Sequence, residues 1–91
     1  MIPRGISVKK LNNFLEDLRK QGLWAERHSY SIRIMYNGKF VASLHLYPGF
    51  NEAVLRLYGD VEVNNMVQEV VYKTVSRYLP DFKLKIQVIS L

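Results

Sequence analysis

The spacing of apolar residues along this chain switches three times between a helical period and strict alternation. Apolar side chains recur every three or four residues over 8–18 and over 66–78, as on one face of an amphipathic helix. Between and after these segments they alternate with polar residues, as in strands that bury one face. The order is α-β-β-β-α-β. It predicts an α+β fold, with a four-stranded, mostly antiparallel sheet and two helices packed on one face.

Capping residues indicate where the predicted helices begin and end. Ser7 can cap the first helix, and Gly22 can take the left-handed conformation that follows its last turn. The second helix is predicted to carry a capping box from Asn65 to Gln68 and to end at Pro80. The strands are predicted over 23–36, 39–47, 53–59 and 82–91. The helical crossover is predicted to place the last strand beside the first, in the sheet order 3-2-1-4.

The dipeptide Asn37-Gly38 raises a conflict about the register of the first two strands. It normally forms a two-residue hairpin turn, but such a turn would place Ile34 and Phe40 on opposite faces of the sheet. Burying either mixed face would leave several apolar side chains exposed, at roughly 1.5–3 kcal/mol each, which outweighs a turn preference. A three-residue loop over 36–38, with Gly38 in a G1 bulge, removes the conflict. This register places Phe40 in the core and Val41 outside.

The same register predicts what the solvent-facing side of the sheet displays. Within the strands that side carries five basic residues and no acid, and three serines form a shallow trough beside Tyr47 and Tyr58. Lys39 stands at its rim. The candidate nucleic-acid-binding residues are Arg27, Arg33, Lys39, His45, Tyr47, Arg56, Tyr58, Lys83 and Lys85.

Length and charge limit the classes of protein that this chain can represent. Its 91 residues predict a single domain over 1–91, and its formal net charge of +5 favours an anionic partner and argues against a mimic of DNA. It has no cysteine and no apolar run long enough to span a membrane, and its first residues lack the apolar stretch that a signal peptide would carry. A cytoplasmic location without a membrane span is therefore expected.

Catalytic signals are absent from the sequence. Neither histidine has a spacing partner for a metal, and no glycine-rich phosphate loop occurs. No carboxylate on the predicted outer side would orient His45 toward a serine, as a nucleophilic triad requires. His28 and Glu26 share the parity of the core residues near the start of a strand, where a frayed end or a bulge accounts for them. We therefore expect a protein that is not an enzyme and has no metal or cofactor.

Three interpretations of the basic sheet face follow. Tyrosine rings can stack on unpaired bases while arginine and lysine neutralise phosphates, so single-stranded nucleic acid is the leading partner. Arg, Tyr and Ser are equally typical of a solvated sheet face that binds nothing. In the third interpretation the face contacts a protein partner or a second copy of the chain, because Met35, Val41, Val54, Ile89 and Leu91 also point outward in this register.

Overall fold

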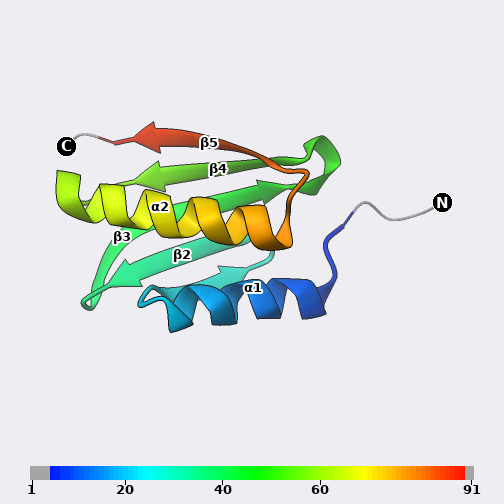
Figure 1. Ribbon diagram of the computed structural model, residues 1–91, viewed down its shortest axis with the longest axis horizontal. Helices are drawn as coiled ribbons and strands as arrows, with labels where there is room; N and C mark the ends of the chain where they lie inside the picture. The colour runs from blue at the N-terminus through cyan, green and yellow to red at the C-terminus, as the bar shows by residue number, and fades with distance from the viewer. Residues whose placement is uncertain (1–4, 90–91) are drawn as a thin grey trace.

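The computed structural model describes residues 5–89 and has two helices and one five-stranded sheet (Figure 1). The strands lie in the order β1-β2-β3-β4-β5; the first four pair antiparallel, and β5 runs parallel to β4. The predicted α+β class is confirmed, with five strands in place of four. The elements are α1 (Val8–Lys20), β1 (Trp24–His28), β2 (Ser31–Tyr36), β3 (Lys39–Tyr47), a 3-10 turn η1 (Pro48–Phe50), β4 (Glu52–Leu57), α2 (Val61–Tyr78) and β5 (Lys83–Val88).

The ends of α1 are fixed by the residues that the sequence indicates. Ser7 caps the helix, because its hydroxyl accepts the backbone N–H of Lys10 at 3.1 Å. At the other end Gly22 has a φ of +95°, and its N–H and that of Leu23 donate to the carbonyls of Arg19 and Leu18. This is a Schellman ending, which needs the left-handed residue that glycine supplies without strain. The buried stripe of α1 consists of Leu11, Phe14, Leu15 and Leu18.

The predicted first strand is in fact a hairpin of two strands, β1 and β2. Ser29 has a φ of +56°, and His28 pairs with Ser31, so a two-residue turn reverses the chain. The turn also reverses the parity: Glu26 and His28 lie on the face opposite the helices, whereas Arg27 lies opposite buried Ile32 on the helix side. The polar residues at core parity are therefore explained by this turn.

At Asn37-Gly38 the structure has the two-residue turn and also buries the isoleucines of β2. Both turn residues have positive φ, +51° and +75°, as in a type I′ turn, and Met35 pairs with Phe40. The register then shifts, and Ile34 pairs with Ala42, so β3 contains a bulge. The predicted three-residue loop is therefore wrong. The bulge keeps the isoleucines in the core. It also reverses the predicted surroundings of two adjacent residues, since Val41 is buried at 6% exposure while Phe40 is 41% exposed.

From Ala42 onward β3 keeps its predicted faces, as does β4, but the two strands pair two residues away from the register that the sequence predicts, which places Leu44 opposite Leu57 and Leu46 opposite Leu55. Leu44 lies opposite Leu55, and Leu46 lies opposite Ala53, so the same side chains remain buried. A two-residue shift in register leaves each side chain on the same face of the sheet, so the predicted faces of these residues are still correct.

The α2 crossover differs from the prediction at its start and in where it delivers the last strand. Asp60 caps α2 through the N–H of Val63 at 2.9 Å, five residues before the predicted cap Asn65. After α2 the chain pairs with β4 in parallel, so β5 is the edge strand beside β4 and does not lie next to the first strand. A helix of this length suffices to return the chain to the adjacent parallel strand.

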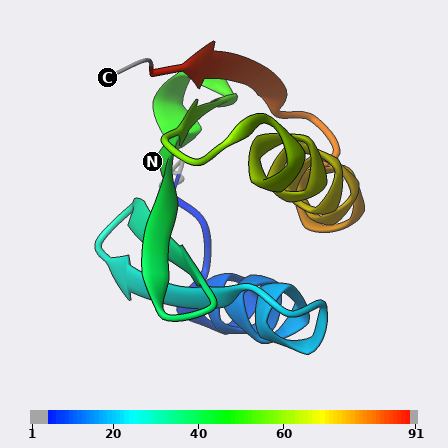
Figure 2. The same cartoon turned by 90° about the vertical axis from the view of Figure 1, so that its left-hand side faces the viewer.

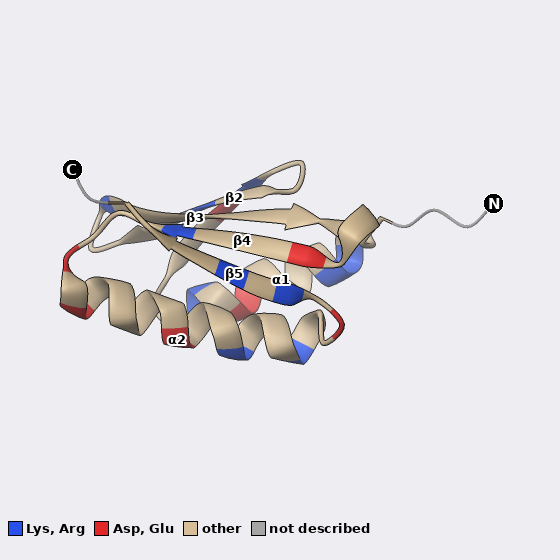
Figure 3. Ribbon diagram, turned by 90° about the horizontal axis from the view of Figure 1, so that it is seen from above, with Lys and Arg blue, Asp and Glu red and all other residues tan. Residues whose placement is uncertain are grey.

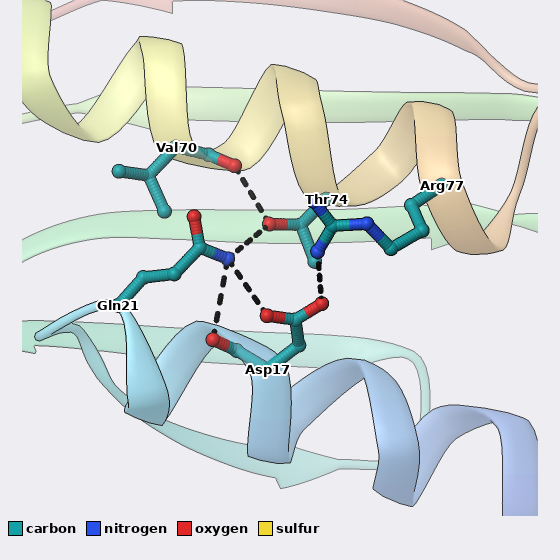
Figure 4. Close-up of polar contacts among 5 residues, drawn as sticks. All are labelled: Asp17, Gln21, Val70, Thr74 and Arg77. Atoms are coloured by element: carbon teal, nitrogen blue, oxygen red, sulfur yellow. Dashed lines mark hydrogen bonds and ion pairs between the residues drawn. The ribbon is translucent and has the colours of Figure 1, made fainter.

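Both helices cover the same face of the sheet (Figure 2). They contact each other through Phe14 and Tyr78, whose rings meet edge to face at 6.1 Å. Beside this contact Gln21 Nε2 donates to Thr74 Oγ1 at 2.9 Å, and Thr74, which is fully buried, donates to the Val70 carbonyl (Figure 4). An ion pair between Asp17 and Arg77 completes the polar link.

Candidate nucleic-acid interface

The candidate site is the outer face, by which we mean the surface of the sheet that faces away from α1 and α2. Side chains alternate across a strand, so cross-strand partners of one outward residue are outward as well. One row crosses all five strands and gives the face its centre: Glu26, Arg33, Ser43, Arg56 and Gln87.

Seven of the nine predicted binding residues share the outer face. Within it, Arg33 and Arg56 lie on either side of Ser43, and Arg56 Nε donates to Gln87 Oε1 at 3.1 Å. Lys83 and Lys85 extend the basic character onto β5, as the basic positions on β4 and β5 in Figure 3 show. The seven residues are Arg33, His45, Tyr47, Arg56, Tyr58, Lys83 and Lys85.

The other two predicted residues lie elsewhere. Arg27 is on the helix side of the sheet, where its guanidinium donates to the Ser29 carbonyl at 3.0 Å. Lys39 pairs with Tyr36 beside the hairpin turn and lines a shallow cavity of about 380 Å³ between that turn and the start of α2. The β1–β2 hairpin accounts for the first correction, because it inverts the parity of every β1 residue.

The outer face also carries acids, contrary to the expectation of a purely basic surface. Glu26 lies opposite Arg33, and Glu52 lies opposite Lys83 and forms an ion pair with Lys85 at 2.6 Å. Figure 3 shows the acidic position on β4 beside the basic ones. The ion pairs among residues 5–89 involve neither Arg33 nor Arg56, so both guanidinium groups are available to an external anion.

His45 joins two serines at the middle of the outer face. Its Nδ1 lies 3.1 Å from Ser31 Oγ, and its Nε2 lies 3.2 Å from Ser43 Oγ. Burial lowers the pKa of His45 below 6.5, and the positive charge of Arg56 lowers it further. The predicted trough therefore contains two serines bridged by the His45 imidazole, while the third serine, Ser29, is in the β1–β2 turn.

Two aromatic residues on the outer face, Trp24 and Phe40, were not predicted from the sequence. Trp24, Met35 and Phe40 are successive cross-strand partners, and the ring of Tyr58 lies 5.1 Å from that of Phe40. We call these four residues the aromatic band. Arg33 lies over the Phe40 ring at 5.6 Å, so the band adjoins the central arginine row. Glu26 and His28 at core parity were the signal that could have revealed the outward position of Trp24.

Of the residues predicted for a protein interface, Met35, Val54 and Ile89 are partly exposed. Val41 is buried in the core and cannot contribute to such a surface. Leu91 lies outside the described residues.

Comparisons with known proteins add no family. No protein-family model matches the chain, and no curated protein has significant sequence similarity to it. Within residues 5–89, no three histidine or acidic side chains gather as metal ligands would. Neither helix in that range has the length and apolar character needed to cross a membrane.

Proposed function

We propose that the protein is a non-enzymatic binding module whose outer face binds single-stranded nucleic acid. The observation that carries the proposal is the juxtaposition of exposed aromatic rings and unpaired arginines on one face. Trp24 and Phe40 are 54% and 41% exposed, and Arg33 and Arg56 stand in the neighbouring row.

The spacing of this face suits a single strand. On β1 and β2 the aromatic band lies two residues from the arginine row, roughly 7 Å along the strand. That separation lets a base stack on Phe40 while its phosphate contacts the arginines. The Trp24 ring already carries the guanidinium of Arg19 from α1 at 4.5 Å. Stacking on an aromatic side chain contributes about 1–3 kcal/mol per base, and only an unpaired base offers its ring face.

The charges predict weak to moderate affinity that depends on salt. Four cations and two acids lie on the outer face, and Lys85 is paired with Glu52. Arg33, Arg56 and Lys83 therefore remain for phosphates. Three phosphate contacts on a single strand give a slope of log affinity against log salt of about −2.

Fluorescence anisotropy with a labelled twelve-residue thymidine strand, dT12, tests the proposal. Titrations at about 50 and 200 mM salt should show saturable binding that weakens with salt. Arg33→Ala and Arg56→Ala should each weaken binding and reduce the slope by about 0.7. Lys9→Ala removes the same charge from the exposed surface of α1 and should change neither. Absence of saturable binding, or equal losses in all three variants, would contradict the proposal.

The aromatic band also favours a second candidate, an interface with a protein or a second copy of the chain. Exposed aromatic residues beside arginine are typical of interface centres. Light scattering of the purified chain separates the two candidates. A stable dimer that dissociates on Phe40→Glu, together with no oligonucleotide binding, would support the second.

A further inference from the structure

The Ser31–His45–Ser43 bridge has a hydrogen-bonding capacity that depends on protonation. A neutral imidazole has one N–H donor and one acceptor nitrogen, so one of the two serines must donate its hydroxyl hydrogen to the ring. When His45 is protonated, both ring nitrogens donate and both serine oxygens accept. The two hydroxyl hydrogens are then free to point toward a ligand above the sheet.

Two arginines stand on either side of this bridge. Arg33 on β2 and Arg56 on β4 are both cross-strand partners of Ser43, so their Cα atoms are on the order of 10 Å apart. In the structure Arg33 lies over the Phe40 ring and Arg56 Nε donates to Gln87 Oε1, and both side chains are long enough to turn toward one anion centred over Ser43. The Ser43 side chain is small and only 9% exposed, so neighbouring side chains cover most of it.

The other charged groups of the outer face are arranged farther along the strands or toward the edges. The cross-strand row that contains His45 runs through Val54 to Lys85 on one side. On the other side it runs through Ser31 to His28. The charged and titratable groups that face His45 are Glu26 and His28 on β1, Arg33 on β2, Tyr47 on β3, Glu52 and Arg56 on β4, and Lys83 and Lys85 on β5.

We propose that Ser31, His45, Ser43, Arg33 and Arg56 form a subsite for one phosphodiester group of a single strand, and that protonation of His45 completes it. The inference rests on the proposed function and deepens it. Protonation adds a positive charge and one hydroxyl donor between the two strands that carry the arginines. Binding of a strand therefore tightens as the pH falls.

The test measures anisotropy of labelled dT12 at pH 7.5 and pH 5.5, because thymine does not titrate in this range. Wild-type affinity should rise about fivefold on acidification, a coupling of ordinary size between two linked sites. His45→Gln keeps a polar side chain without a titratable ring and should abolish the rise. His28→Gln, at the edge of the same row, is the matched control and should keep it.

A second measurement does not depend on the variants folding. The titration midpoint of the His45 imidazole, followed by NMR, should move upward when dT12 saturates the wild-type protein, since binding and protonation are reciprocal. In competition at pH 6, both unlabelled dT12 and inorganic phosphate are tested for displacement of the labelled strand. Counted as phosphate groups, dT12 should be effective at a far lower concentration than inorganic phosphate. Equal competition would overturn the assignment to a diester.

The outcomes separate the two proposals. Binding with the same pH dependence in wild type and His45→Gln, and an unmoved imidazole titration, would overturn the subsite and leave the proposed function standing. Absence of dT12 binding at both pH values would overturn both.

Discussion

Phe40 and Val41 are neighbours in the chain with opposite surroundings. Phe40 lies on the outer face under Arg33, and Val41 is buried in the core at 6% exposure. The bulge in β3 is the cause, because it adds one residue between the pairs that Ala42 and Phe40 make with β2.

The opposite surroundings of Phe40 and Val41 predict opposite effects when each is replaced by alanine. Val41→Ala should lower the free energy of unfolding by about 2 kcal/mol, from lost burial and a small cavity, and leave dT12 affinity intact. Phe40→Ala should cost less than about 1 kcal/mol of stability but weaken dT12 binding, because it removes a stacking platform. Urea unfolding and anisotropy measure the two effects. The reverse pattern would contradict the bulge.

Asp17 links the two helices through its charge. Partial burial raises its pKa, but hydrogen bonds from Arg77, Tyr78 and Gln21 and the charge of Arg77 outweigh burial, and its pKa lies below 3.8. The folded state therefore favours the carboxylate. The stability that this provides is fully present above pH 3.8 and is lost as the pH falls through the folded-state pKa.

Substitution of Asp17 tests this linkage. Asp17→Asn keeps an acceptor for Gln21 and removes the ion pair with Arg77. It should lower the free energy of unfolding by about 1 kcal/mol at pH 6, a value reduced by the exposure of Arg77. The difference from wild type should shrink below pH 3.8. Urea unfolding at several pH values measures it, and a difference that stays constant with pH would exclude the charge as its cause.

The β2–β3 turn depends on glycine at one position. Gly38 has a φ of +75°, which other residues adopt at a cost, whereas Gly49 in η1 has no positive φ and nothing within 4 Å of an added Cβ. Gly38→Ala should therefore lower stability by about 1 kcal/mol, and Gly49→Ala should leave it within about 0.5 kcal/mol. Thermal unfolding of both variants gives the comparison. Equal effects would argue against a left-handed residue at position 38.

Local chemistry explains which elements could be predicted from the sequence. Ser7, Gly22 and the leucine stripe of α1 act within a few residues, and their roles are confirmed. The β1–β2 turn could not be recognised, because "HSYS" contains no glycine, proline or asparagine to mark a reversal. The β3 bulge was missed for a similar reason, since no residue type is required at its extra position.

Strand order is a property of the whole molecule, and local patterns carry little information about it. The alternation of Lys83 to Val88 predicts a strand and its faces, but not which strand it joins. The outer face depends on that choice. β5 beside β4 places Gln87 against Arg56 and Lys85 against Glu52, contacts that the predicted order would not make. The candidate site was therefore largely predicted in its residues and only partly in its arrangement.

NMR chemical-shift mapping tests the central claim, that the outer face binds single-stranded nucleic acid, most directly. Titration of the ¹⁵N-labelled protein with dT12 should shift the backbone amide resonances around Arg33, Phe40, Ser43 and Arg56, and the shifts should saturate. The amide resonances of α1 and α2 should not shift, because the helices cover the opposite face of the sheet. Shifts confined to the helices, or no shifts at saturating concentrations of dT12, would contradict the account.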